Sequence, residues 1–151
     1  MSIRLHHAGI VVPDLESAIT FYSEFLGLKE DFRFAWDESD REDIETVIDL
    51  SESAASAVML EGDGYHLELF EYRAPSSTVD PSTERACDSG IRHLAFEVSD
   101  IEEACGRFLR AGGTLHHAPV PLGNSLCIYG RDPFGNIIEL MQPIEDVDPL
   151  P

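Results

Sequence analysis

Two histidines and two glutamates stand at matching places in the two halves of the chain. His7 and His93 each open a short apolar stretch, and these stretches read HAGIVVPD and HLAFEVSD. Glu68 and Glu139 each lie inside an apolar, strand-like segment, HLELFEY and NIIELMQ. Ionised carboxylates seldom occupy such segments unless they are paired or bound to a metal. The repeat therefore supplies one imidazole and one carboxylate twice.

These four side chains are donors that suit one divalent transition-metal ion. We expect His7, Glu68, His93 and Glu139 to bind a single Ni²⁺, Zn²⁺, Fe²⁺, Mn²⁺ or Co²⁺ ion, because imidazole and carboxylate together serve all of these metals. Four protein ligands leave coordination positions for water or for substrate oxygens. A metal held in this way is a useful Lewis acid.

Other histidines lie beside the expected ligands. His6 precedes His7 and is expected to point to the opposite face of a regular strand. The choice of His7 rests on the repeat, since His7 and His93 are 86 residues apart and so are the helices that follow them. His66 shares a strand face with Glu68, which leaves it as an alternative ligand, as a partner of the ligands or as a purely structural residue.

The elements that must position these residues are also written twice. Asp14 and Asp100 each follow their histidine by seven positions, where a helix N-cap is expected. The predicted helices, 14–27 and 100–113, both end at glycine. The strand-like segments that follow them are 28–36, 55–60 and 65–72 in the first half, and 114–117, 125–130 and 136–142 in the second. The predicted fold class is therefore α+β, with two paired βαβββ modules.

The expected boundaries follow from composition. They are a first module over 1–72, a linker over 73–90 that is rich in Pro, Ser and Thr, a second module over 91–142 and a tail over 143–151. The charged stretch at 36–45 is interpreted as a solvated loop or a mobile lid. It lies in the region that makes the first His-to-Glu spacing 15 residues longer than the second.

The net charge of -19 limits the classes of partner. Nucleic acids and anionic membranes attract positive proteins, so neither is expected here. We find no apolar run long enough to span a bilayer and no secretory signal, and we expect a cytoplasmic protein. The three cysteines have neither the number nor the spacing of a disulfide framework. A small-molecule substrate and a homodimer are the expected partners.

The paired HxxxxxxD openings, the LEL strand and the ending DPFGNIIEL resemble the vicinal oxygen chelate superfamily over about residues 5–142. Its members include glyoxalase I, methylmalonyl-CoA epimerase, extradiol dioxygenases and fosfomycin or bleomycin resistance proteins. The resemblance implies that the mixed sheets of the two modules curl around a metal-centred cleft. It also implies that the ligands of the glyoxalase type fall on His7, Glu68, His93 and Glu139.

The function implied by this resemblance is that of a metal-dependent lyase or isomerase of the glyoxalase type. The substrate would chelate the metal through vicinal oxygens and react through an enediolate, with Glu139 or Glu68 as the general base. Glyoxalase I often has an asparagine where this chain has Phe70, Glu71 and Tyr72, so glutathione is not favoured as cosubstrate. Phe70 and Tyr72 are expected either to line an apolar substrate pocket or to pack in the core.

Three alternatives remain open. An extradiol-type dioxygenase has histidine where this chain has Glu68. A methylmalonyl-CoA epimerase has a second carboxylate on its third strand, whereas the corresponding segment here reads ASAVML. A non-catalytic binding or resistance protein would hold a small molecule in the same cleft without turning it over.

Overall fold

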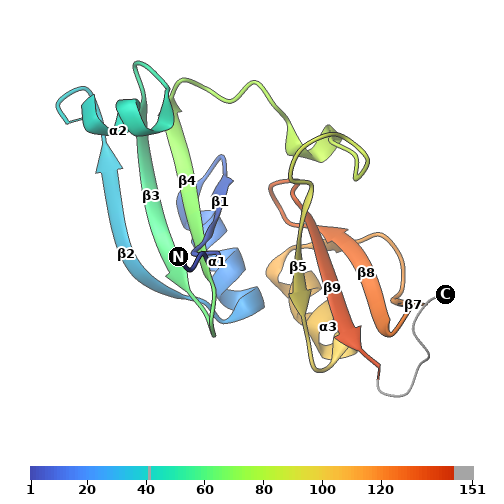
Figure 1. Ribbon diagram of the computed structural model, residues 1–151. Coiled ribbons are helices and arrows are strands. Elements are labelled where there is room, and N and C mark those ends of the chain that lie inside the picture. Colours follow the sequence, from blue (N-terminus) through green and yellow to red (C-terminus); the bar gives the residue numbers. More distant parts are fainter. Residues whose placement is uncertain (41, 145–151) are drawn as a thin grey trace. The chain divides into compact units, whose positions relative to one another are not determined.

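The computed structural model describes residues 1–40 and 42–144. The chain divides into two compact units, Met1–Val79 and Asp80–Pro151 (Figure 1). Each unit has a mixed sheet with helical cover, and the α+β class with two βαβββ modules is confirmed.

The first unit holds a four-stranded sheet in the order β1-β4-β3-β2. Strand β1 runs parallel to β4, and the other pairs are antiparallel. Helix α1 packs against β3 and β4. The elements in chain order are β1 (Ala8–Val11), α1 (Leu15–Leu26), β2 (Lys29–Trp36), α2 (Glu42–Ile48), β3 (Ala54–Glu61) and β4 (His66–Ala74).

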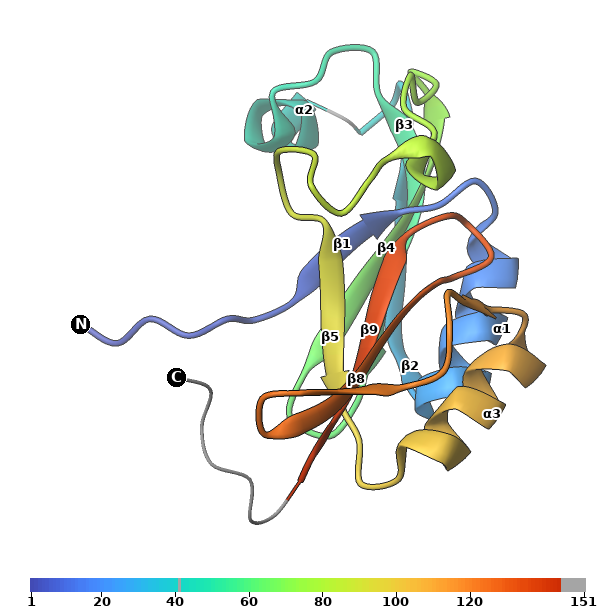
Figure 2. The ribbon, with the colours of Figure 1, turned by 90° about the vertical axis from the view of Figure 1, so that its right-hand side faces the viewer.

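The second unit repeats this topology, with the order β5-β9-β8-β6 and a further strand, β7, paired with β8. Figure 2 labels its strands β5, β9 and β8 and its helix α3. Strand β5 is parallel to β9, and helix α3 packs against β9 and β6. The elements are the short 3-10 helix η1 (Pro81–Thr83), β5 (His93–Glu97), α3 (Ile101–Ala111), β6 (Thr114–Leu115), β7 (Val120–Leu122), β8 (Ser125–Arg131) and β9 (Ile137–Pro143).

Both long helices begin and end where the sequence predicts. The side chain of Asp14 accepts a hydrogen bond from the backbone of Ser17, and that of Asp100 accepts one from Glu103. Gly27 and Gly112 close the two helices in the left-handed conformation, with φ of 74° and 110°.

Strand alternation separates the core of each unit from its other face. In the first unit Leu67 and Leu69 of β4 are buried, as is Tyr22 of α1. Glu68, between the two leucines, faces the opposite side of the sheet. In the second unit Ile138 and Leu140 of β9 are buried with Phe108 of α3. Each core thus forms between a helix and one face of a sheet, and the other face of each sheet is left to carry Glu68 or Glu139.

The structure differs from the sequence-based expectations in several places, one of which is the unpredicted strand β7. The charged stretch is not simply a loop, because it leads into the helix α2, whose Ile44 and Ile48 pack against the sheet. Strand β3 runs one residue beyond the expected segment and ends on the exposed Glu61, so the expectation that it lacks a carboxylate is wrong at its last residue. The segment expected to be a linker includes η1, to which Arg131 donates at the carbonyl of Pro81.

The expected tail lies mostly outside the described residues, since only 143 and 144 of it are described. Within the described part of the chain, no helix is long and apolar enough to cross a membrane.

Candidate metal centre

Glu68 and Glu139 occupy equivalent positions on the last strands of the two units. Gly9 of β1 lies opposite Glu68 in the parallel pair, and Ala95 of β5 lies opposite Glu139. Both carboxylates point away from the buried core because they alternate with its residues along the strand. The topology therefore presents one carboxylate on the same face of each sheet.

Each glutamate contacts the histidine that the repeat assigns to it. His7 Nε2 lies 3.0 Å from Glu68 Oε2, and His93 Nε2 lies 3.2 Å from Glu139 Oε2. The histidine side chain is 37% exposed and the glutamate side chain 14% exposed in both pairs. The two pairs are thus alike in partners, in contact atoms and in exposure.

The expected orientation of His6 is wrong. His6 and His7 precede β1, so strict alternation does not govern them. The ring of His6 stacks on that of His66, with centroids 5.4 Å apart and planes 5° from parallel, and its Nδ1 lies 2.9 Å from His7 Nδ1. Since His66 shares its face of β4 with Glu68, His6 also lies on this side of the sheet.

The donors of each unit match half of a coordination sphere. Neutral imidazole and carboxylate are suitable ligands for a divalent transition metal, and each unit offers one of each. Among the residues that the structure describes, no group of three or more His, Cys, Asp or Glu side chains is arranged to hold a metal ion.

In the second unit, two side chains that the sequence did not predict lie beside the His93–Glu139 pair. Tyr129 lies opposite Glu139 in the β8–β9 register, and its hydroxyl is 3.5 Å from both ring nitrogens of His93. Burial, and then the negative charge of Glu139, raise the pKa of Tyr129. The same two causes raise the pKa of the Cys127 thiol, which also hydrogen-bonds to Glu139.

In the first unit, the His7–Glu68 pair has different neighbouring side chains. Met59 lies opposite Glu68, where the second unit has a tyrosine. Farther along the same face is Tyr72, whose pKa is raised by burial and then by the charge of Glu68. The two half-sites therefore share their donors but not their neighbours.

Glu71 has a structural role and does not lie beside the proposed metal ligands. Its carboxylate accepts a hydrogen bond of 2.8 Å from the backbone of Leu15, at the start of α1. Gln142 does the same for Ile101 at the start of α3, also at 2.8 Å. Each follows its glutamate of the repeat by three positions, so this second repeated feature could have been found in the sequence.

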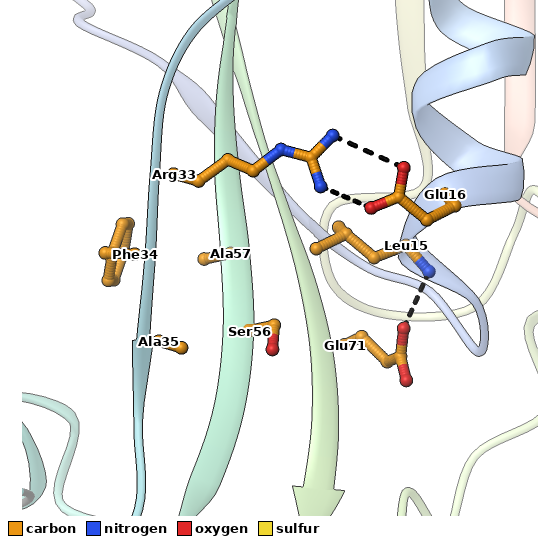
Figure 3. Close-up of a pocket in the computed structure, with 8 residues that line it drawn as sticks. All are labelled: Leu15, Glu16, Arg33, Phe34, Ala35, Ser56, Ala57 and Glu71. Carbon is orange, nitrogen blue, oxygen red and sulfur yellow. Dashed lines mark hydrogen bonds and ion pairs between the residues drawn. The ribbon is translucent and has the colours of Figure 1, made fainter.

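A hollow of about 390 Å³ on the first unit includes residues from the α1 side of the sheet (Figure 3). Arg33 crosses it to pair with Glu16, and Glu71 reaches the backbone of Leu15. Arg33 and Glu71 alternate with the residues of the Glu68 face along their strands, so they point to the opposite side of the sheet. The hollow is therefore distinct from the candidate metal centre.

The family model described as Glyoxalase/Bleomycin resistance protein/Dioxygenase superfamily matches residues 4–140. The chain belongs to this superfamily. The matched range contains residues of both units and includes all four repeat-derived donors.

Relatives within the superfamily include enzymes of two kinds. A 2-epi-5-epi-valiolone epimerase from an Actinomyces species is 29% identical over 93% of this chain and 79% of its own length. A lactoylglutathione lyase from Salmonella typhimurium is 29% identical over 93% of both chains. A glyoxalase family protein from Bacillus cereus has a TM-score of 0.83 at 26% identity, over 95% of this chain and 96% of its own. Superfamily relatives of this chain therefore include an epimerase and a lyase.

Proposed function

We propose that this protein is a metal-dependent lyase or isomerase that moves a proton on a small substrate with vicinal oxygens. His7, Glu68, His93 and Glu139 would together bind one divalent ion of Ni, Zn, Fe, Mn or Co. The observation that carries the proposal is the repeated His–Glu contact, 3.0 Å in one unit and 3.2 Å in the other. The relatives support it, since epimerases and lyases of this superfamily are among them.

The carboxylates supply the general base of the proposed reaction. In this proposal Glu139, or Glu68 in its place, accepts a proton from the carbon next to a carbonyl, and the substrate becomes an enediolate. A bound divalent metal lowers the energy of the negative charge that develops on the substrate oxygens. Returning the proton to the other side of the same carbon gives an epimer, and returning it to the neighbouring carbon gives an isomer or a lyase product.

The surroundings of Glu139 suit the role of a base better than those of Glu68. Tyr129 and Cys127 both lie next to Glu139, and each can donate a hydrogen bond to a substrate oxygen on which negative charge develops. Glu68 faces Met59 instead, which carries no such donor. We therefore assign the proton transfer to Glu139 and a purely coordinating role to Glu68.

Deuterium exchange tests this function and does not require the product to be identified. Panels of 2-hydroxy ketones, hemithioacetals and acyl-CoA thioesters are incubated in D₂O with the protein, with and without added divalent metal. We expect exchange at the carbon next to the carbonyl that requires both protein and metal. Oxygen uptake with a catechol panel, without any such exchange, would overturn the proposal in favour of the dioxygenase alternative. A homodimer remains our expectation for the assembly.

A further inference from the structure

Four aromatic rings form one continuous surface on the Glu68 face of the first unit. Phe34 and Phe70 flank Ala57, and Trp36 and Tyr72 flank Ala55, in the register of β2, β3 and β4. The small alanines allow rings from β2 and β4 to meet across β3. Ring centroids lie 6.4 Å apart for Phe34–Phe70 and 5.7 Å apart for Trp36–Tyr72. We call Phe34, Trp36, Phe70 and Tyr72 the aromatic wall.

The wall is only partly covered. Trp36 is buried, but Phe34, Phe70 and Tyr72 remain partly exposed. Ile44 and Ile48 of α2 pack against it. Because the corresponding segment of the second unit has no helix, this cover belongs to the first unit alone.

The aromatic wall adjoins the candidate metal centre. The next row of the sheet contains Met59, Glu68 and Gly9, and Phe70 follows Glu68 by two positions on the same face. A side chain at Gly9 would place its Cβ 3.5 Å from the Phe70 ring. Glycine at this position therefore leaves open space beside the Phe70 ring.

The charges near the aromatic wall disfavour an anionic ligand. The first turn of α2 carries Glu42, Asp43 and Glu45. Arg73 of β4 lies on the other face, where it donates to the hydroxyl of Ser56. Within the described residues of the wall and of α2, there is no lysine or arginine. A phosphate or carboxylate tail on the ligand would thus meet the negative charge of the first turn of α2.

We propose that the substrate carries an uncharged aromatic or alicyclic ring, which lies on Phe70 and Phe34 while its vicinal oxygens reach the metal at Glu68. This inference rests on the proposed function and narrows its substrate class. It separates this protein from enzymes that take CoA thioesters or glutathione adducts. Stacked and edge-on ring contacts supply the recognition, since aromatic pairs add to the gain from apolar burial.

Two bidentate probes that differ only in a ring test this proposal. Benzohydroxamic acid and acetohydroxamic acid both chelate metals through vicinal oxygens, and only the first carries a phenyl group. Trp36 is the single tryptophan of the chain, so tryptophan emission reports on the wall itself. Binding of each probe is followed by this emission at saturating Zn²⁺, and Zn²⁺ binding is measured separately by calorimetry.

We expect the wild type to bind benzohydroxamic acid at least about tenfold more tightly than acetohydroxamic acid, the gain of one good ring contact. The ratio should fall to about one in Phe70→Ala, with Zn²⁺ affinity unchanged. Phe70→Leu, which keeps the apolar volume, should give an intermediate ratio. Val47→Ala is the matched control, because Val47 is 83% exposed on α2, and it should behave as the wild type.

Gly9→Val supplies a second variant in case the ring substitution prevents folding. The backbone of Gly9 is not left-handed, and its Cβ would meet Phe70 at ordinary van der Waals distance. The new side chain should fill the open space and weaken only the benzohydroxamic acid complex. Equal affinities of the two probes for the wild type, with Zn²⁺ bound, would overturn the ring proposal and leave the metal site standing. Failure to bind Zn²⁺ would overturn both.

Discussion

Glu139 has two roles in the proposed mechanism, as a metal ligand and as a base, and an amide can keep only the first. We predict that Glu139→Gln retains much of the metal affinity, because the amide oxygen still coordinates. Its turnover should fall by about 10²–10⁴, the usual contribution of a general base. Calorimetry for the metal and exchange rates in D₂O for the reaction measure the two effects separately.

Glu68→Gln is the matched control, since Glu68 occupies the equivalent strand position with the same exposure. It should lose less activity, because Met59 lies opposite Glu68 where Tyr129 lies opposite Glu139. Full activity of Glu139→Gln on the same substrate would remove Glu139 as the base.

Adjacent histidines before β1 are predicted to differ in function. His7→Ala should abolish metal binding, because Nε2 of His7 is the atom that lies 3.0 Å from Glu68. His6→Ala should leave most of the affinity, since His6 contacts Nδ1 of His7 and not the Nε2 that faces Glu68. Metal titrations of the two variants measure this directly, and the reverse pattern would show that His6 is the ligand.

At the scale of elements, α2 and the strand it covers are tied together by Ser53. The indole Nε1–H of Trp36 donates to the buried hydroxyl of Ser53 at 2.9 Å, and the backbone of Ser53 donates to Glu45 of α2 at 2.7 Å. Ser53→Ala would leave the buried indole donor without a partner. We predict a loss of about 1–3 kcal/mol in the free energy of unfolding.

Urea unfolding followed by the emission of Trp36 measures this loss in the first unit. Ser51→Ala is the matched control, because Ser51 is exposed in the same connection and should change stability by less than about 0.5 kcal/mol. Equal stability of Ser53→Ala and the wild type would show that water satisfies the indole.

The repeat and local capping signals made the elements predictable, whereas contacts set by strand register and by packing between elements could not be predicted. Asp14 and Asp100 mark both helix starts because capping is a local property of the sequence. Tyr129 could not be paired with Glu139, because strand register depends on the turn that joins β8 and β9. Helix α2 was not predicted because its sequence is acidic, and its stability depends on packing against the aromatic wall.

The whole molecule carries a net charge of -19, which should make its stability depend on salt. Repulsion among carboxylates opposes compaction at low ionic strength, and it is screened over about 3 Å at molar salt. We predict that the melting temperature of the metal-free protein rises between dilute buffer and about 1 M NaCl. An unchanged melting temperature would mean that ion pairs such as Arg33–Glu16 already offset the repulsion.

We propose that His7, Glu68, His93 and Glu139 bind one metal ion together, and metal stoichiometry tests this proposal most directly. Each unit supplies one histidine and one glutamate in contact, and among the described residues no three His, Cys, Asp or Glu side chains are arranged to hold a metal ion. Calorimetric titration of the chelator-treated protein with Zn²⁺ or Mn²⁺ should therefore give one ion per chain. Two ions per chain, one for each His–Glu pair, or no binding at all, would contradict the shared site.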